Sequence, residues 1–230
     1  MPVPAPVVLF LPARDEEATV GAVVARAPHR VLGHPVQCVV VDDGSADATA
    51  ARTRAAGADV VALDGRCGLG AAVRRGLAEG VRRHAGAIAF CDADGEYAAE
   101  ELDRIVEAIL AGRADYVVGS RFAGHIERMS RARQLGNRAF TRVLSWLARR
   151  PIRDGRSGYR ALSPEAAAAA EIVHDYNYAQ VLTLDLLRKG FRYVEVPISY
   201  HSRETGRSFV RPLPYLRHVV PAVIRELSRT

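Results

Sequence analysis

Two pairs of acidic residues, each placed directly after an apolar run, are the residues in this sequence best suited to chemistry. Asp92 and Asp94 follow the run Ala87–Cys91 and are followed in turn by Gly95 and Glu96. Two carboxylates at the end of a buried strand supply the hard oxygen ligands that Mg²⁺ and Mn²⁺ prefer. Such an ion neutralises a diphosphate and makes a nucleotide a better leaving group. An isolated Asp-x-Asp is more often a turn or a solvated loop.

The second pair, Asp42 and Asp43, follows the apolar run Val36–Val41 and precedes Gly44-Ser45. If both runs are parallel strands of one sheet, their acidic ends meet at the edge where ligands of open α/β sheets bind. A carboxylate there accepts hydrogen bonds from a base or a ribose. The alternative role for this pair is to cap the helix expected next. Repetition of the pattern favours an active-site edge.

Strand and helix patterns alternate through the first half of the chain. We expect strands at Val7–Leu11, Val36–Val41, Val60–Leu63, Ala87–Cys91 and Tyr116–Val118, and helices from Pro12 to about Ala27, near 47–56, from Gly68 to about Arg83, and over Glu100–Leu110. Short joints between such elements imply right-handed crossovers and a mainly parallel central sheet flanked by helices on both faces. The less regular second half predicts helices over Arg133–Leu147 and after Ser163-Pro164, and a strand over Phe191–Pro197.

Length and composition indicate one α/β domain. The 230 residues are 49% hydrophobic and 25% charged, which is typical of a soluble globular protein. No stretch reaches the roughly 18 apolar residues of a membrane span, and the N-terminus lacks the features of a secretion signal. The cysteines, Cys38, Cys67 and Cys91, are odd in number, and two of them lie in apolar runs. We therefore expect reduced core thiols in a cytosolic protein.

The net charge of +6 is unevenly distributed. Residues 1–120 carry 12 Arg against 17 acids, whereas residues 121–160 carry 11 Arg against only Glu127 and Asp154. A basic block that follows an acidic half suggests that a polyanion is bound there. A nucleic-acid-binding module is one function for such a block, but aromatic residues make up only 7% of the chain and no binding motif is present.

The last residues have the pattern of an amphipathic helix. Apolar residues recur at helical spacing and three Arg accompany them, while Pro221 interrupts the run. The apolar positions are Leu216, Val219, Val220, Val223 and Leu227. The segment either packs on its own sheet or lies in a membrane interface.

Taken in order, the motifs resemble those of the family-two inverting glycosyltransferases of the GT-A fold, particularly the dolichol- or polyprenyl-phosphate mannosyltransferase branch. The matching segments are Pro12-Ala13-Arg14-Asp15-Glu16, Val41–Ser45, Gly68-Leu69-Gly70, Asp92–Glu96, Gly119-Ser120-Arg121, Asp154 with Ser157-Gly158 and Arg160, Glu195–Ile198, and Arg203 with Gly206 and Ser208. Three positions depart from the family pattern, since Asp15 replaces Asn, Glu96 replaces Gln and Phe209 replaces Lys.

The resemblance implies a single glycosyltransferase domain over residues 1–230. Residues 7–120 would bind the nucleotide sugar, residues 121–212 the acceptor, and residues 213–230 would form the amphipathic helix. The implied nucleotide-sugar contacts are Pro12, Ala13, Glu16, Asp42, Asp43, Gly68, Gly70, Asp92 and Ala93. Two plainer alternatives stay open: Glu16 is an acid in the first turn of a helix, and Gly68-x-Gly70 forms a tight turn.

The resemblance also implies a metal site and a phosphate site. Asp92 and Asp94 would bind Mg²⁺ or Mn²⁺, with Glu96 as a third ligand, and the implied catalytic residues are Asp92, Asp94 and Arg121. Acceptor and phosphate contacts would come from Arg121, Arg131, Ser157, Arg203 and Arg207. We place Arg121, Arg128, Arg131 and Arg133 in or beside a flexible segment. Arg suits this role because its planar fork binds phosphate oxygens in pairs.

The implied reaction moves a hexose, mannose or glucose, from a GDP- or UDP-linked sugar to polyprenyl or dolichyl phosphate. A phosphate monoester is already anionic at neutral pH, since its second pKa is about 6, so it needs no strong base. A hydroxyl acceptor would need one, and Asp154 and Glu96 are the candidates. With no membrane span, the enzyme would reach the inner face of the cytoplasmic membrane through its Arg-rich face, its last helix or a membrane partner protein.

Three other functions are weighed against this one. A glycosyltransferase that acts on a soluble acceptor, such as a sugar or a phosphorylated small acid, keeps the same donor site. A nucleic-acid-binding module would use the Arg-rich segment, but we expect no nucleic-acid partner. The intact acidic pair argues against a catalytically silent scaffold.

Overall fold

The computed structural model describes residues 4–127, 131–173 and 178–201, with some side chains of the helix after residue 130 excepted. The strands are β1 Val7–Ala13, β2 Arg30–Val31, β3 His34–Asp42, β4 Asp59–Ala62, β5 Ala87–Phe90, β6 Tyr116–Ile126, β7 Arg160–Leu162 and β8 Tyr193–Tyr200. The helices are α1 Val20–Arg26, α2 Thr49–Ala55, α3 Leu69–Arg82, α4 Leu102–Leu110 after a short 3₁₀ turn at Ala99–Glu101, α5 Arg131–Ala148, α6 Pro164–Ala169 and α7 Ala179–Arg188.

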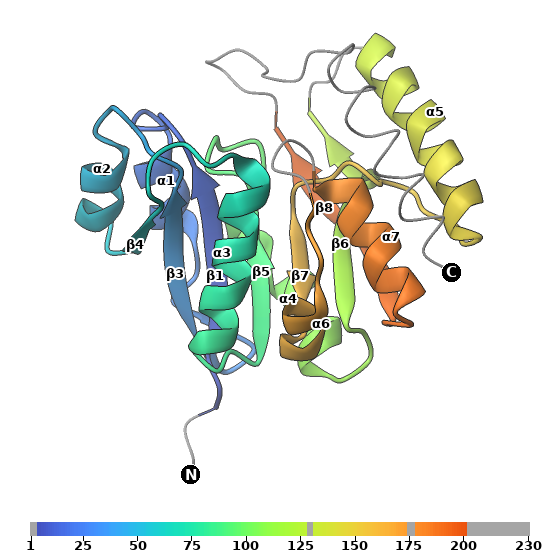
Figure 1. The fold of residues 1–230 in the computed structure, drawn as a ribbon, viewed down its shortest axis with the longest axis horizontal. Helices are drawn as coiled ribbons and strands as arrows, with labels where there is room; N and C mark the ends of the chain where they lie inside the picture. Colours follow the sequence, from blue (N-terminus) through green and yellow to red (C-terminus); the bar gives the residue numbers. More distant parts are fainter. Residues whose placement is uncertain (1–3, 128–130, 174–177, 202–230) are drawn as a thin grey trace.

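The strands of the described residues form one mixed sheet (Figure 1). Its order is β2-β3-β1-β5-β7-β6-β8, and β4 also pairs with β3. Strands β4, β3, β1 and β5 run parallel to one another, as do β6 and β8. The short strand β7 runs antiparallel to both of its neighbours, β5 and β6. The expected α/β class is therefore confirmed, with an antiparallel insertion in a sheet predicted to be mainly parallel.

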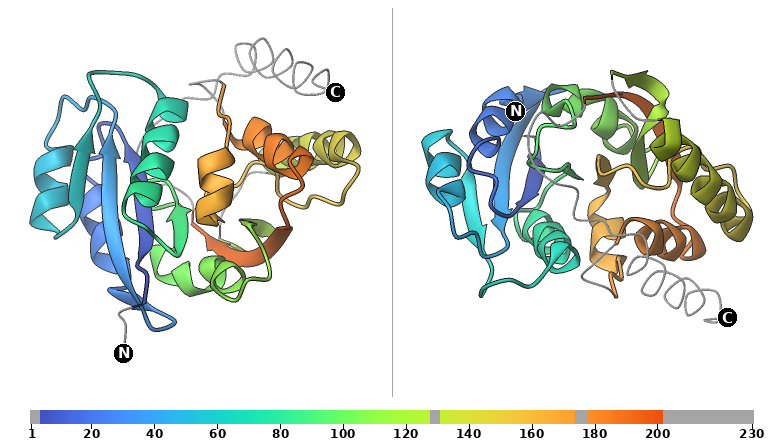
Figure 2. Two further views of the ribbon diagram at one scale, coloured as in Figure 1. Left: turned by 60° about the horizontal axis from the view of Figure 1, so that its bottom comes forward. Right: turned by 90° about the horizontal axis from the view of Figure 1, so that it is seen from above.

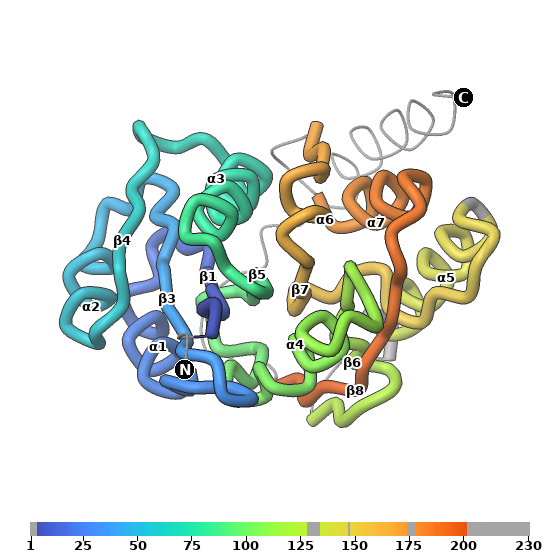
Figure 3. The backbone as a smooth tube through the Cα atoms, turned by 90° about the horizontal axis from the view of Figure 1, so that it is seen from below, coloured from blue at the N-terminus to red at the C-terminus, as the bar shows by residue number. Residues whose placement is uncertain are grey.

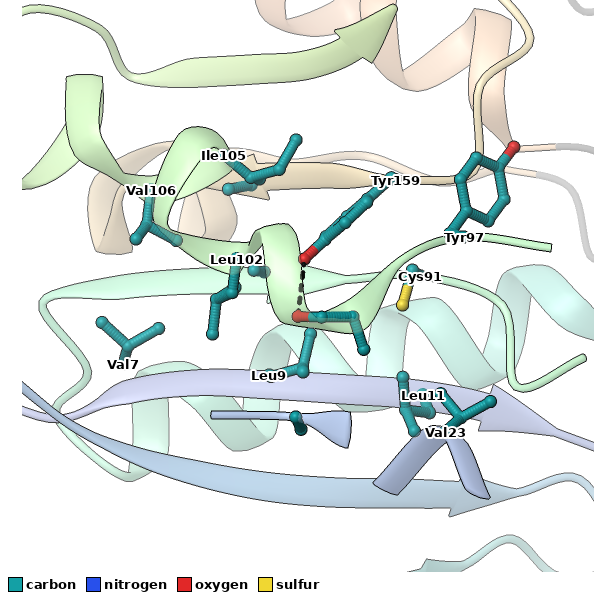
Figure 4. Packing of buried hydrophobic residues seen from close by; sticks show 14 of the residues in the cluster. Val7, Leu9, Leu11, Val23, Cys91, Tyr97, Leu102, Ile105, Val106 and Tyr159 are labelled. Atoms are coloured by element: carbon teal, nitrogen blue, oxygen red, sulfur yellow. Dashed lines mark hydrogen bonds between the residues drawn. The ribbon is translucent and has the colours of Figure 1, made fainter. Parts of the chain in front are cut away.

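Alternating residues of the strands face two separate apolar layers. In β1, Val7, Leu9 and Leu11 lie in one layer, while Val8 and Phe10 lie in the other. Figure 4 shows the first layer, where α4 packs over β1 and the Tyr159 hydroxyl donates to the Ala99 carbonyl. Helices α1 and α4 cover this face, and α3, α6 and α7 cover the opposite one (Figure 3). Burial on both faces explains why these strands read as continuous apolar runs.

Helix α3 lies against the sheet at unusually short range because two of its residues are glycines. A Cβ atom at Gly80 would lie 2.6 Å from the Ile88 side chain, and one at Gly76 would overlap the Phe10 ring. The two turns of α3 that carry these glycines therefore bring backbone, rather than side chains, onto β1 and β5. This close packing fixes the start of α3 near the carboxyl ends of the strands.

Most predicted elements are found, and two boundaries differ by eight residues each. The helix expected from Pro12 starts only at Val20, because residues 14–17 are held in a turn by bonds to residues 45–49. Within that turn Asp15 has a φ of 52°. The strand expected at Tyr116–Val118 continues to Ile126, so the expectation that Arg121 lies in or beside a flexible segment is wrong. The helix expected over 213–230 lies outside the described residues.

Two further expectations concern the thiols and the membrane. Cys38, Cys67 and Cys91 are all free thiols; Cys91 is buried and Cys67 is exposed. Burial raises the pKa of Cys38 to about 12, and Asp59 adds to the effect. Within residues 4–127, 131–173 and 178–201, none of the helices combines the length and the apolar character needed to span a bilayer.

Replacing Gly80 with Ala should destabilise the fold by about 1–3 kcal/mol, because the added methyl group overpacks the contact with Ile88. The matched control is Gly136→Ala in α5, where a Cβ atom has no neighbour within 4 Å. That substitution should stabilise the protein by about 0.5–1 kcal/mol through helix propensity. Urea unfolding of both variants measures the difference, and equal shifts in the two would show that the α3 contact is not tight.

Candidate active site

The site is built at the edge of the sheet where β1, β3 and β5 end. The strand register aligns Phe10 with both Val39 and Phe90, and aligns Ala13 with Asp42. Asp92 follows β5 by two residues, so it lies level with Pro12 at the end of β1. Because β1 separates β3 from β5, the two acidic strand ends are about 10 Å apart. This distance lets one extended ligand reach both acidic ends.

Asp42 and Asp43 are nearly buried and hold the loops around the end of β3. Asp42 accepts a bond from the Ser45 amide at 2.9 Å. Asp43 accepts bonds from the amides of Cys67, at 2.6 Å, and Gly68, at 2.9 and 3.0 Å. Asp43 therefore fixes the loop that opens α3, where Gly68 adopts a φ of 97°.

The other residues predicted to contact the nucleotide lie around the same edge. Pro12 and Ala13 are buried at the end of β1, and the Ala13 carbonyl accepts the Asp43 amide. Glu16 accepts the Thr19 hydroxyl at 2.8 Å, and its backbone carbonyl accepts the Val20 amide at the start of α1. Glu16 lies four residues before α1, whose first turn contains no acid, so it is not the first-turn helix acid that the alternative supposed. Gly70 is buried in the first turn of α3.

The loop Asp92–Glu96 presents the acidic pair. Asp92 is half-buried and Asp94 and Glu96 are nearly buried. Gly95 takes a φ of 78°, and Asp94 accepts the Glu96 amide at 2.9 Å, which closes a tight turn. In the part of the chain that the structure describes, no three His, Cys, Asp or Glu side chains converge as metal ligands. The predicted third ligand, Glu96, is therefore not gathered with the two aspartates in this arrangement.

Gly158, just before β7, lies beside Asp92, just after the neighbouring strand β5. The antiparallel register that pairs Phe90 with Arg160 brings these two residues together, two positions further along each strand. A Cβ atom at residue 158 would lie 2.6 Å from Asp92 Oδ2. The Gly158 amide donates to the Tyr97 hydroxyl at 2.7 Å, and Tyr97 is fully buried. Position 158 thus requires glycine, because the Asp92 carboxylate occupies the space that a side chain would fill.

A buried ion pair joins β6 to the turn before β7. Arg121 Nε and Nη2 donate to Asp154 at 2.7 and 2.8 Å, and the Arg121 amide donates to the same carboxylate at 3.0 Å. The Arg156 amide adds a bond at 3.3 Å. Asp154 is 0% exposed and Arg121 is 3% exposed. Burial by itself lowers the pKa of Arg121, but Tyr97 and the bonds to Asp154 outweigh it, so that pKa is raised above its usual value.

Two other side chains, one half-buried and one fully buried, hold this turn. Glu195 in β8 accepts the amides of Arg153 and Asp154 at 2.9–3.1 Å. Arg160 donates to the carbonyls of Ser157, at 2.8 Å, and Gly155, at 3.2 Å. The other Arg160 donors reach α7 through the Ala179 carbonyl and the Thr183 hydroxyl. The turn is thereby fixed from β6, β8 and α7 at once.

The predicted site residues fall into two groups. The structure brings the nucleotide-contact and metal residues to one sheet edge, and it places Ser157 in the adjacent buried turn and Arg121 in β6 against that turn. Ser157 is fully buried and accepts the Tyr159 amide at 3.3 Å. The side chains of Arg131 and Arg133, together with Arg128, Arg203 and Arg207, lie outside the described part of the chain.

Comparison with known proteins decides the family. The family model described as "Glycosyl transferase family 2" matches residues 9–167, more than half of the chain. The chain is a member of glycosyl transferase family 2. In this glycosyltransferase the match covers both acidic strand ends and the turn that contains Asp154.

The relatives of this glycosyltransferase include enzymes named for lipid-phosphate acceptors. The polyprenol monophosphomannose synthase of Mycolicibacterium smegmatis is 32% identical over 87% of this chain and 79% of its own. The undecaprenyl-phosphate mannosyltransferase of Micrococcus luteus is 33% identical over 74% of each chain. Glycosyltransferase AglJ of Haloferax volcanii is 29% identical over 90% of this chain, which spans 66% of that relative's length.

Solved structures confirm the GT-A fold of this glycosyltransferase. Glucosyl-3-phosphoglycerate synthase of Mycobacterium tuberculosis, in complex with Mn²⁺, UDP and phosphoglyceric acid, superposes with a TM-score of 0.77. It is 23% identical and covers 97% of this chain and 79% of its own.

Sequence reasoning assigned no role to three residues that hold the site. Tyr97, Arg160 and Glu195 each connect the turn at 153–158 to another element. The available signal for Arg160 and Glu195 was their place in the segments that match the family pattern. Their partners are 41 to 61 residues away for Glu195 and Tyr97, so only the folded chain identifies them.

Replacing Asp154 with Asn should cost about 3–5 kcal/mol of folding free energy, because it leaves the buried Arg121 charge without its counterion. The matched control is Asp115→Asn. Asp115 pairs with Arg192, whose side chain is 56% exposed. The control should cost about 1 kcal/mol or less. Denaturant unfolding distinguishes the two, and a small loss for Asp154→Asn would contradict the central place given to this pair.

Replacing Gly158 with Ala should lower the rate of glycosyl transfer about 10²-fold, because the methyl group displaces the Asp92 carboxylate. Gly86→Ala is the control, since the nearest atom to its Cβ would be at an ordinary 3.5 Å. Steady-state kinetics at saturating donor measure kcat for both variants. Equal kcat values in Gly158→Ala and the wild type would show that the Asp92 position does not matter.

Proposed function

We propose that this protein transfers a hexose, mannose or glucose, from a GDP- or UDP-linked sugar to polyprenyl or dolichyl phosphate, with inversion at the anomeric carbon. The observation that carries the proposal is the convergence of Asp42, Asp43, Asp92 and Asp94 at one sheet edge beside a buried Arg–Asp pair. The names of the relatives, which include a polyprenol monophosphomannose synthase and an undecaprenyl-phosphate mannosyltransferase, support the lipid-phosphate acceptor.

The donor would lie across the ends of β3, β1 and β5. Pro12, Ala13 and Asp43 would border the base and ribose, and the backbone at Gly68 and Gly70 would allow close approach at the start of α3. The diphosphate would then reach the Asp92–Asp94 loop. The distance of about 10 Å between the two acidic ends suits the length of a nucleoside diphosphate.

A divalent ion, Mg²⁺ or Mn²⁺, would be held by Asp92 and Asp94. Two carboxylates supply only part of a coordination shell, which suits an ion that also takes donor phosphate oxygens and water. When bound, the ion stabilises the negative charge that grows on the departing diphosphate. The solved glucosyl-3-phosphoglycerate synthase contains Mn²⁺ together with UDP, which supports a metal-bound donor here.

The acceptor is inferred from the groups available for proton transfer. Each Asp154 oxygen accepts two hydrogen bonds, which fill the four lone-pair sites of a carboxylate. Asp154 therefore cannot take a proton from a hydroxyl acceptor without breaking the pair with Arg121. A phosphate monoester needs no such base, because its oxygen is already anionic at neutral pH.

In the proposed reaction a phosphate oxygen of the acceptor attacks the anomeric carbon on the face opposite the diphosphate. The new carbon–oxygen bond forms as the bond to the donor phosphate breaks, and its electron pair leaves with the nucleoside diphosphate. Arg131, Arg203 and Arg207 would bind the acceptor phosphate. Contacts from Arg121 and Ser157, which are 3% and 0% exposed, would require the acceptor to open the buried turn. A lipid acceptor would place the enzyme at the inner face of the cytoplasmic membrane, as a peripheral protein.

Asp94→Ala should reduce transfer about 10²-fold or more with the fold intact, because the ion loses one of its two carboxylate ligands. Asp103→Ala, an exposed acid in the first turn of α4, is the control. Circular dichroism confirms folding, and product mass measures transfer from a panel of GDP- and UDP-sugars with Mg²⁺ or Mn²⁺. Undiminished turnover in Asp94→Ala would refute the metal assignment.

The same panel tests the acceptor. Polyprenyl phosphate should yield a glycosylated product, whereas free polyprenol should yield none because it brings no anionic oxygen. Transfer to 3-phosphoglycerate in preference to polyprenyl phosphate would instead establish the soluble-acceptor function.

A further inference from the structure

Helix α5 turns several uncharged polar side chains inward and several large apolar side chains outward. At about 3.6 residues per turn, its described residues divide into two opposite faces. The inner face consists of Gln134, Asn137, Phe140, Thr141, Leu144, Ser145 and Ala148, all buried or half-buried. The outer face consists of Leu135, Gly136, Arg138, Ala139, Arg142, Val143 and Trp146, all exposed. Figures 1 and 2 show α5 at the periphery of the molecule, beyond α7.

The inner face is occupied by contacts with the turn of Asp154. Asn137 accepts a bond from Arg156 at 3.0 Å, and Thr141 accepts the Gly155 amide at 3.4 Å. Leu144 packs against Ile152 and Leu184. These contacts dock the helix through its inner face; on the outer face, Arg138 also lies over the Phe122 ring of β6, 5.4 Å from the ring centroid.

The outer face exposes large apolar side chains to an unusual extent. Trp146 is 77% exposed, Leu135 71% and Val143 55%. These three make up half of the large hydrophobic side chains that are exposed in the described part of the chain. Because they share one face of one helix, they form a stripe, and such stripes mark interaction surfaces.

The charged residues of this segment of the chain are all positive. Residues 128–153 contain eight Arg and no Asp, Glu or Lys. Arg138 and Arg142 lie on the outer face itself, and Arg149 and Arg150 follow at its end, all of them exposed. An apolar stripe flanked by Arg complements a surface that is apolar beneath and anionic above.

We propose that the outer face of α5, defined by Leu135, Arg138, Arg142, Val143 and Trp146, docks on the surface of a bilayer that contains anionic lipids. The apolar side chains would enter the boundary between headgroups and acyl chains, where Trp is favoured, and the Arg side chains would bind headgroup phosphates. The surface deepens the proposed function, on which its purpose rests, because it brings the active site to the membrane that would hold a polyprenyl phosphate.

A second copy of the chain is the other occupant to consider. Self-association through this face would bring two sets of Arg side chains against each other, and no acid on the face would neutralise them. Anionic lipids supply the missing charge, so the bilayer is favoured.

Docking through α5 would also orient the active site. The same helix holds Gly155 and Arg156 through its inner face, next to the Arg121–Asp154 pair. The turn and the bilayer would then lie on opposite sides of one helix, about 10 Å thick. A lipid phosphate at the headgroup level would be within reach of the turn.

Trp146 is the only tryptophan of the chain, so its fluorescence reports on this face alone. The full-length wild-type protein is mixed with acceptor-free vesicles of phosphatidylglycerol and phosphatidylcholine, or of phosphatidylcholine alone. We expect a blue shift of the emission and protection from acrylamide with the anionic vesicles, both weakened by high salt. Flotation of the protein with an unchanged Trp146 spectrum would overturn the proposal, as would no flotation at all.

A variant tests the energetic role of the stripe. Leu135→Gln, Val143→Gln and Trp146→Gln, combined, should weaken vesicle binding at least ten-fold, since three apolar groups no longer leave water. Leu32→Gln, at a position 54% exposed elsewhere on the surface, is the control and should bind as the wild type does. Equal binding by the triple variant would overturn the proposal. A blue shift that depends on protein concentration without lipid would also overturn it, in favour of a second copy.

A transfer assay separates this proposal from the proposed function. With a short-chain, water-soluble polyprenyl phosphate, the triple variant should retain wild-type turnover, because none of its three positions touches the site. With long-chain acceptor in vesicles, its turnover should fall at least ten-fold. Lack of transfer to either acceptor by the wild type, with the Trp146 shift present, would refute the proposed function and leave the docking surface standing.

Discussion

The buried pair of Arg121 and Asp154 is the interaction on which the site depends. It joins β6 to the turn before β7, and the other end of that turn places Gly158 against Asp92. A buried charge is tolerated only with its partner and its hydrogen bonds in place, so the turn has one conformation. Glu195 of β8 also holds the turn, and so does Arg160 of β7, which bonds to α7 as well. The acidic loop of the first half is therefore positioned in part by residues of the second.

The direction of β7 explains how the second half reaches the acidic edge. Because β7 runs antiparallel to both neighbours, its first residue, Arg160, lies opposite Phe90 at the end of β5 and opposite Val118 of β6. The turn at 153–158 consequently lies at the carboxyl edge, together with Asp92 and the end of β3. A parallel strand in the same place would have left that turn at the opposite edge, away from the acidic residues. The mixed sheet is thus a condition of the site and not an incidental departure from a parallel one.

Helix α5 extends this arrangement to the molecular surface. Its inner face carries polar groups that bond to the turn, and its outer face exposes Leu135, Val143 and Trp146 among Arg side chains. A helix of an ordinary globular protein has the reverse pattern. This reversed pattern in α5 is consistent with a helix that lies between the active site and a bilayer, as the proposed transfer to a lipid acceptor requires.

The sequence by itself determined the succession of strands and helices along the first half, the acidic strand ends and the family resemblance, because these depend on local apolar runs and on motifs of a few residues. It also indicated the basic block after residue 120. Only the tertiary structure decided that β7 is antiparallel, that Arg121 lies in a strand and binds Asp154, and that Gly158 faces Asp92. Those features join residues tens of positions apart, and no local pattern encodes such contacts. The outward apolar face of α5 also became visible only when its inner face was seen to be filled.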